Sequence, residues 1–161
     1  MNVSIIILTT FIHASIERCY DVSRSVELHL LSTQHTGERV VAGRQSGLFE
    51  EGEEVTWEAR HFGILQQLTV RITAMDRPHY FADRMVKGAF KSMFHEHFFR
   101  SAAEGCEMED RFNYEVPFGV LGALFDAVIL KRYMRRFLIV RNEAIKRAAE
   151  GEGWKVLLQH A

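Results

Sequence analysis

Four ionisable residues in the second half of the chain have the spacing of a site. His95 and His97 are two positions apart, and residues at i and i+2 of a strand point to the same face of a sheet. Asp83 lies in the alternating segment before them, and Asp110 lies in the one after them. If these segments are neighbouring strands, two imidazoles and two carboxylates meet on one face.

Three kinds of chemistry fit such a group. A carboxylate that orients an imidazole can form an acid/base pair that moves a proton on an enolisable substrate. Two histidines and a carboxylate can bind zinc or iron, but the sequence alone shows no third ligand converging on the two histidines. A buried network can also simply satisfy the polar groups of the sheet. We favour the network, and expect no metal and no other cofactor.

Large apolar residues surround these positions. The chain has 12 Phe against 2 Trp and 4 Tyr, and rings without a polar tip suit the wall of a pocket for apolar ligands. Trp57 and His61 share one face of an earlier alternating segment, so we assign them to the same wall. The residues expected to contact a ligand from the strands are Trp57, His61, Phe81, Met85, His95, His97, Phe99, Phe112 and Tyr114.

The elements that would position these residues can be read from the periodicity. Two short helices are expected within 14–33, joined near Arg24, with serines such as Ser15 and Ser25 as N-caps. Short turns between successive strands indicate an antiparallel meander. The expected strands are 3–12, 40–42, 54–62, 68–74, 79–88, 91–102 and 106–116.

A long amphipathic helix is expected to follow Pro117, which suits a first helical turn. No further proline occurs over residues 118–149, so the helix could run for about 50 Å. We expect Leu121, Phe125, Val128, Ile129 and Phe137 to face the ligand. Arg132 lies near this stripe and could pair with a buried carboxylate such as Asp83 or Asp110. The basic residues over 131–136 otherwise suit the solvated face of the helix.

The totals bound the class of protein. A chain of 161 residues suits one domain, which we place at residues 1–149, with 150–161 as a C-terminal tail. The 20 Lys and Arg against 21 Asp and Glu give a net charge of -1, which argues against a nucleic-acid partner.

The N-terminus and the cysteines bear on localisation. The apolar run at residues 1–8 has no basic residue and is too short to span a bilayer, so a strand is expected and no stable membrane insertion. Cys19 and Cys106 have no metal-ligand spacing and are expected to be free thiols, which fits a cytoplasmic protein.

Six segments carry a resemblance to a known superfamily. They are IERCYDVSRS (16–25), TWEARHFG (56–63), MVKGAF (85–90), FHEHFF (94–99), DRFNY (110–114) and RYMRR (132–136). With the order of elements, the chain resembles the START-like, helix-grip superfamily (SRPBCC), specifically a bacterial branch among its polyketide cyclase/dehydrase and lipid-transport types.

The resemblance implies an α+β helix-grip fold. In that fold a curved antiparallel sheet of about seven strands wraps around the long C-terminal helix, with two short helices after the first strand. It also implies a cavity between helix and sheet for a lipid-, quinone- or polyketide-like molecule.

Three functions remain open at this stage. We expect the chain to bind or carry a hydrophobic or amphipathic small molecule, and expect a binding protein rather than an enzyme. One alternative is a cyclase/dehydratase-type enzyme that uses His95 or His97 as its base. The other is a protein-interaction domain with a vestigial pocket, which could form a homodimer through an exposed apolar patch near Phe62.

Overall fold

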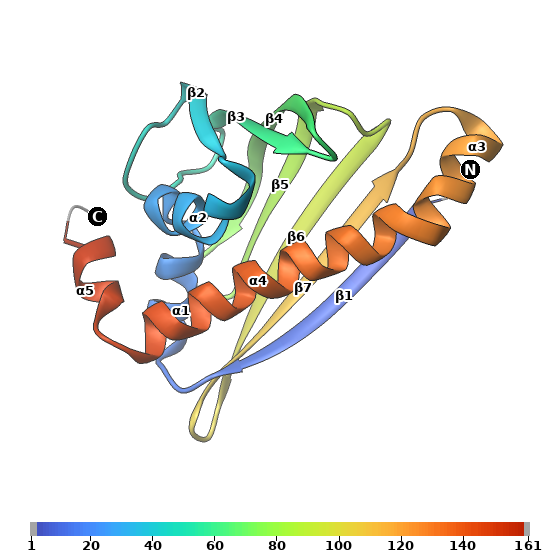
Figure 1. The fold of residues 1–161 in the computed structure, drawn as a ribbon. Helices are drawn as coiled ribbons and strands as arrows, with labels where there is room; N and C mark the ends of the chain where they lie inside the picture. The colour runs from blue at the N-terminus through green and yellow to red at the C-terminus, as the bar shows by residue number, and fades with distance from the viewer. Residues whose placement is uncertain (1–2, 160–161) are drawn as a thin grey trace.

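The computed structural model describes residues 3–159 and has a single curved sheet gripping a long helical segment (Figure 1). The strands are β1 (Val3–Ile12), β2 (Arg39–Gly43), β3 (Glu54–His61), β4 (Ile64–Asp76), β5 (Tyr80–Lys87), β6 (Ser92–Ala102) and β7 (Gly105–Glu115). The helical elements are α1 (Ile16–Ser23), α2 (Val26–Ser32), η1 (Gln34–Thr36), α3 (Gly119–Phe125), η2 (Asp126–Leu130), α4 (Lys131–Glu150) and α5 (Gly153–Leu157).

The seven strands form one antiparallel sheet in the order β1-β7-β6-β5-β4-β3-β2. From β2 to β7 each strand pairs with its neighbour in sequence. β1 instead pairs with β7, the last strand in the chain. Figure 1 shows α4 lying across the concave face of this sheet. The helix-grip fold expected from the sequence is confirmed.

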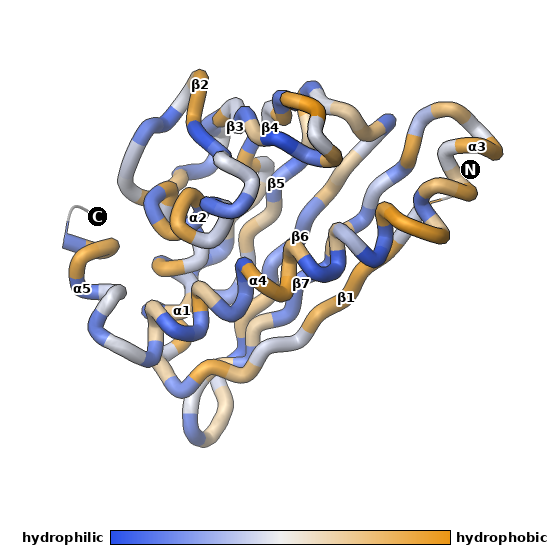
Figure 2. Tube along the Cα trace, in the orientation of Figure 1, coloured by the Kyte–Doolittle hydropathy of each residue, from blue (hydrophilic) through white to orange (hydrophobic). Residues whose placement is uncertain are grey.

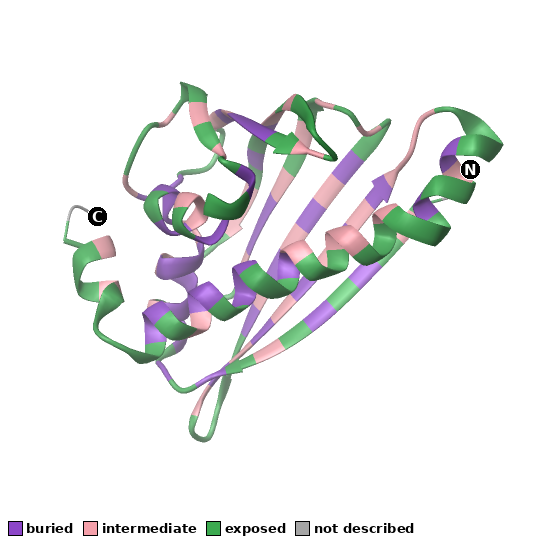
Figure 3. Ribbon diagram, in the orientation of Figure 1, coloured by how far each residue is buried: buried purple, intermediate pink, exposed green. Residues whose placement is uncertain are grey.

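Period-two alternation positions the side chains of the central strands. In β6 and β7 buried residues alternate with more exposed ones, so one face is dry and the other is partly wet (Figure 3). His95 and His97 are both on the buried face of β6, and Asp110 is on the buried face of β7. These residues therefore point toward the helix.

Two capped helices close one end of the sheet. The hydroxyl of Ser15 accepts a hydrogen bond from the Arg18 N–H at 3.3 Å, and that of Ser25 accepts one from the Leu28 N–H at 3.2 Å. α1 buries Cys19 and other apolar residues against the second half of α4, and Cys106 of β7 joins the same core. Both cysteines are buried free thiols. Buried apolar side chains fill the space between α1, the end of α4 and the sheet.

The long helix differs from the expectation in its start and in its regularity. It begins at Gly119 rather than at Pro117, because Phe118 adopts the left-handed backbone conformation (φ 69°). The wider π-helical turn η2 lies between α3 and α4, so the helix does not keep 3.6 residues per turn throughout. Figures 2 and 3 show that α3 is hydrophobic yet largely exposed. Among residues 3–159, no helix is both long enough and apolar enough to cross a membrane.

The segment after residue 150, which we expected to be a tail, contains the short helix α5. Trp154, Leu157 and Leu158 pack against the core formed by α1 and the end of α4. The guanidinium of Arg18 lies 4.2 Å from the centre of the Trp154 ring. These contacts hold most of the segment against the domain.

Candidate functional site

A cavity of about 340 Å³ lies between the long helix and the concave face of the sheet. Its lining is mostly apolar, and its volume falls within the range of small-molecule sites. Eight residues expected to contact a ligand line it, namely Trp57, His61, Phe81, His95, His97, Phe112, Phe125 and Phe137. Six of these eight residues lie on strands, so most of the strand residues expected to contact a ligand do line the cavity.

Three expected wall residues on the strands lie outside the lining. Phe99 belongs to the core beside α1, because β6 extends beyond the end of the cavity. Tyr114 is buried, and its hydroxyl donates to Asp126 of η2 at 2.5 Å. Met85 is partly buried and packs against a second cluster of buried apolar residues, which includes Val70 and Phe112. The alternation along a strand thus predicts which side of the sheet a residue faces, but not how far the cavity extends along the strand.

Three of the five residues expected to face the ligand from the helix lie on its outer face. Leu121, Val128 and Ile129 are 77%, 65% and 46% exposed and do not line the cavity. Arg132 is also exposed, so its expected pairing with Asp83 or Asp110 is wrong. The residues that face the cavity from the second half of the helical segment are Leu130, Tyr133, Met134, Phe137, Leu138 and Arg141.

Two features of the helical segment explain why three of the expected residues face outward: the composition of its inner face and the π turn. Gly122, Asp126 and Arg141 occupy buried positions, so small or polar residues interrupt the apolar stripe that periodicity would detect. The five-residue π turn also rotates α3 relative to α4. A search with a constant 3.6-residue period therefore selects the outer face over this segment.

The four ionisable residues singled out in the sequence do come together, and we call them the His–Asp cluster (Asp83, His95, His97 and Asp110). His97 pairs directly with Asp110 across β6 and β7, and its Nδ1 is 2.7 Å from Asp110 Oδ1. His95 Nε2 is 3.0 Å from the same oxygen. His97 Nε2 is 3.3 Å from Asp83 Oδ1 on β5.

The helix completes this cluster with two residues that the sequence analysis missed. Asn142 Nδ2 donates to Asp110 Oδ2 at 2.6 Å, and Arg141 Nη1 lies 3.4 Å from Asp110 Oδ1. Arg141 Nη2 also donates to the Ser23 carbonyl at 3.2 Å. The signal that could have found Arg141 is its helical spacing from Leu138 and Ile145, which are both buried.

Burial and pairing set the charges. Burial opposes ionisation of Asp110, but hydrogen bonds from both histidines and the Arg141 charge hold its pKa well below the ordinary value. Burial alone would raise the pKa of Asp83, but the His97 hydrogen bond and the nearby charges, including that of Arg141, together lower it. Burial, together with the neighbouring His97, lowers the pKa of His95 to about 4. At neutral pH both carboxylates are ionised and His95 is neutral.

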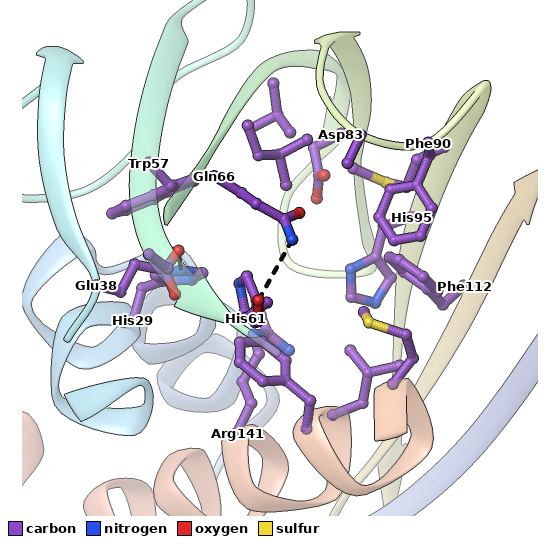
Figure 4. A pocket seen from close by; sticks show the side chains of 18 of the residues that line it. His29, Glu38, Trp57, His61, Gln66, Asp83, Phe90, His95, Phe112 and Arg141 are labelled. Atoms are coloured by element: carbon purple, nitrogen blue, oxygen red, sulfur yellow. Dashed lines mark hydrogen bonds and ion pairs between the residues drawn. The ribbon is translucent and has the colours of Figure 1, made fainter. Parts of the chain in front are cut away.

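A second polar group lies on the β3 side of the cavity (Figure 4). His61 Nδ1 is 2.7 Å from the Tyr133 hydroxyl, and burial lowers the pKa of His61. His29 stacks on Trp57 at 4.0 Å between ring centres and contacts Glu38 at 3.1 Å. His29 and Glu38 were not expected from the sequence.

Phe62, expected on an outer apolar patch, lies at the rim of the cavity. Its ring centre is 5.7 Å from that of Phe125 and 4.6 Å from that of Tyr133. Its backbone is left-handed (φ 52°), which turns the chain from β3 into β4. Phe62 therefore joins the sheet to the helix.

Comparison with known proteins identifies the fold. No family model and no curated protein sequence matches the chain. The structure is similar to that of TTHA0849 from Thermus thermophilus, with a TM-score of 0.70 and 18% identity over 91% of this chain and 99% of that one.

Two further similar structures carry more descriptive names. Ginseng major latex-like protein 151 from Panax ginseng gives a TM-score of 0.68 and 16% identity over 92% of this chain and 99% of that one. The di-domain ARO/CYC StfQ from the steffimycin biosynthetic pathway gives 0.66 and 12% identity, over 92% of this chain and 50% of that one. The chain thus shares the helix-grip fold of these structures, with an apolar cavity and a polar cluster in its wall.

Proposed function

We propose that the protein binds or carries a hydrophobic or amphipathic small molecule in the cavity between the long helix and the sheet. The observation that carries this proposal is the mostly apolar cavity of about 340 Å³, whose polar groups gather at a few points of the wall. Apolar walls supply affinity, and a few placed polar groups fix orientation. A lipid-, quinone- or polyketide-like molecule has this chemistry.

An acid/base enzyme of cyclase/dehydratase type is the second candidate. It is favoured by the contact of His97 with the carboxylates of Asp83 and Asp110. His95 is poorly suited as the base, because a group with a pKa of about 4 binds a proton weakly at neutral pH. The similar StfQ structure is named for a biosynthetic pathway, which keeps this candidate open.

Ligand binding is tested by displacement of a fluorescent fatty acid and by native mass spectrometry of protein purified from cells. Ala59 is buried in the cavity wall, so Ala59→Phe fills part of the space and should abolish saturable probe binding. Ala127 is exposed on the outer side of the helix, so Ala127→Phe is the matched control and should bind normally. No saturable binding by the unmodified protein, or equal binding by both variants, would overturn the proposal.

Catalysis is tested separately with enolisable polyketide-like substrates. Turnover that depends on pH and is lost in a folded His95→Gln/His97→Gln double variant would establish the second candidate. Saturable binding of the same compounds without turnover would leave the binding function alone.

A further inference from the structure

Three potential metal ligands converge in the cavity wall. One oxygen of Asp83 and one ring nitrogen each of His95 and His97 lie within 4.8 Å of one another. All three residues line the cavity. Atoms that bind zinc tetrahedrally at about 2.0–2.1 Å are roughly 3.3 Å apart. The distance from Asp83 Oδ1 to His97 Nε2 is 3.3 Å, which matches one edge of such a site.

Asp110 contacts one ring nitrogen of each imidazole. Its Oδ1 accepts from His97 Nδ1 at 2.7 Å and from His95 Nε2 at 3.0 Å. A proton on these nitrogens leaves a lone pair on the other nitrogen of each neutral ring. A carboxylate behind the imidazole is the usual device that fixes a metal-binding histidine. Asn142 and Arg141 hold Asp110 itself in place.

A metal ion would contact all three ligand atoms at once. Asp83 Oδ1 and His97 Nε2 are 3.3 Å apart, a separation that a hydrogen bond between the two residues also explains. A metal ion also accounts for the third ligand atom, from His95.

Charge indicates what would complete the coordination. Asp83, Asp110 and Arg141 sum to one negative charge when both histidines are neutral, and a divalent ion changes this sum to one positive charge. A buried charge is costly unless it is paired. An anionic oxygen donor would neutralise the site.

We propose that Asp83, His95 and His97 bind one divalent transition-metal ion, and that its open coordination position receives an anionic oxygen of the cavity ligand. A carboxylate, phenolate or enolate on an amphipathic molecule has the required chemistry. The metal site stands independently of the proposed function, whereas the assignment of the ligand class rests on it.

Metal binding is tested on chelator-treated, full-length protein with Co²⁺ and Zn²⁺. We expect one equivalent per chain by elemental analysis, and Co²⁺ ligand-field bands of a four- or five-coordinate site. Asp83→Asn and His95→Gln should lose this uptake, while Asp110→Asn should weaken it about 10- to 100-fold. His61→Gln removes a cavity imidazole outside the cluster and should leave uptake unchanged.

Two results would overturn the metal site. One is uptake that is equal in the unmodified protein and in Asp83→Asn, which would place the metal elsewhere. The other is absence of uptake together with ¹⁵N NMR signals showing protons on both His97 nitrogens. Should His95→Gln fail to fold, Asp83→Asn decides, since Asp83 is less buried than either histidine.

The ligand class is tested with dodecanoic acid and its methyl ester, on Zn²⁺-loaded and metal-free protein. Zinc should tighten binding of the acid and leave binding of the ester unchanged. Equal effects on both would overturn the anionic donor. Uptake of zinc with no binding of either compound would instead count against the proposed function, so the two failures are distinguishable.

Discussion

At the scale of single residues, Asp110 organises the polar wall. It is fully buried and lies within hydrogen-bond distance of two histidines, an asparagine and an arginine. A buried carboxylate depends on such partners. Removing one of them leaves an uncompensated charge in the interior, which destabilises the protein by more than the pairing stabilised it. Arg141 is the cationic partner of Asp110 on the helix.

Replacing Arg141 with Met should destabilise the protein by about 2–4 kcal/mol, since Asp110 would keep its charge without its cation. Arg132→Met is the matched control on the same helix and should change stability by less than about 0.5 kcal/mol, because Arg132 is exposed. Urea denaturation of the three proteins measures both effects. Equal losses in the two variants would contradict the assignment of Arg141.

His61 should make stability depend on pH. Burial lowers its pKa in the folded chain, with Glu38 opposing and His35 reinforcing the shift, and the Tyr133 hydroxyl contacts its Nδ1. The unfolded chain therefore takes up a proton at higher pH, near the ordinary value of about 6.5. Stability is unaffected above that value and falls as pH decreases toward the folded pKa.

The measurement is urea denaturation at several values between about pH 8 and pH 5. His61→Gln should reduce the loss of stability on acidification, and His79→Gln, which changes an exposed histidine, should not. An identical pH dependence in His61→Gln and the unmodified protein would contradict the role of His61.

At the scale of elements, the π turn η2 is attached to the sheet by one buried carboxylate. Asp126 accepts hydrogen bonds from the Tyr114 hydroxyl at 2.5 Å and from the Ser4 hydroxyl. Burial and the neighbouring Asp126 raise the pKa of Tyr114. Since α3 is largely exposed, this contact ties the first part of the helical segment to β1 and β7.

Asp126→Ala should cost about 1–3 kcal/mol, because it leaves two hydroxyl groups without their acceptor. Tyr114→Phe removes one of these hydroxyls, so the double variant should lose less stability than the sum of the single changes. Chemical denaturation of the four proteins gives the coupling energy. Strict additivity would show that the two side chains do not interact.

At the scale of the whole molecule, the sheet and helix enclose a cavity beside a core of packed apolar side chains. At one end of the sheet, α1, α5 and the end of α4 fill the space above the strands. At the other end, the second cluster of buried apolar residues borders the cavity. A bound apolar molecule would supply contacts that the cavity lacks, so binding should stabilise the fold.

A ligand present at about 100 times its Kd should raise the Tm by roughly 5–10 °C, since it contributes about 2.7 kcal/mol to a domain of this size. Differential scanning calorimetry with the molecule identified by native mass spectrometry measures the shift. Ala59→Phe should show little or no shift, and Ala127→Phe should show the full one. A full shift in Ala59→Phe would place the ligand outside the cavity.

The sequence by itself determined the number and order of the strands, the two capped helices and the shared face of His95 and His97, because these follow from local period and local capping. It underestimated the length of β4, which runs over Ile64–Asp76 where 68–74 was expected. It also indicated that Asp83 and Asp110 would join them, since successive strands in a meander become neighbours. Only the tertiary structure decided which helix residues face the sheet. Arg141, Asn142 and Asp126 are polar, and their burial depends on partners far away in the chain, while the π turn changes the rotation of the helix. The length of the cavity along each strand was likewise decided by packing, which is why Phe99 and Tyr114 lie in the core although they share the face of the His–Asp cluster.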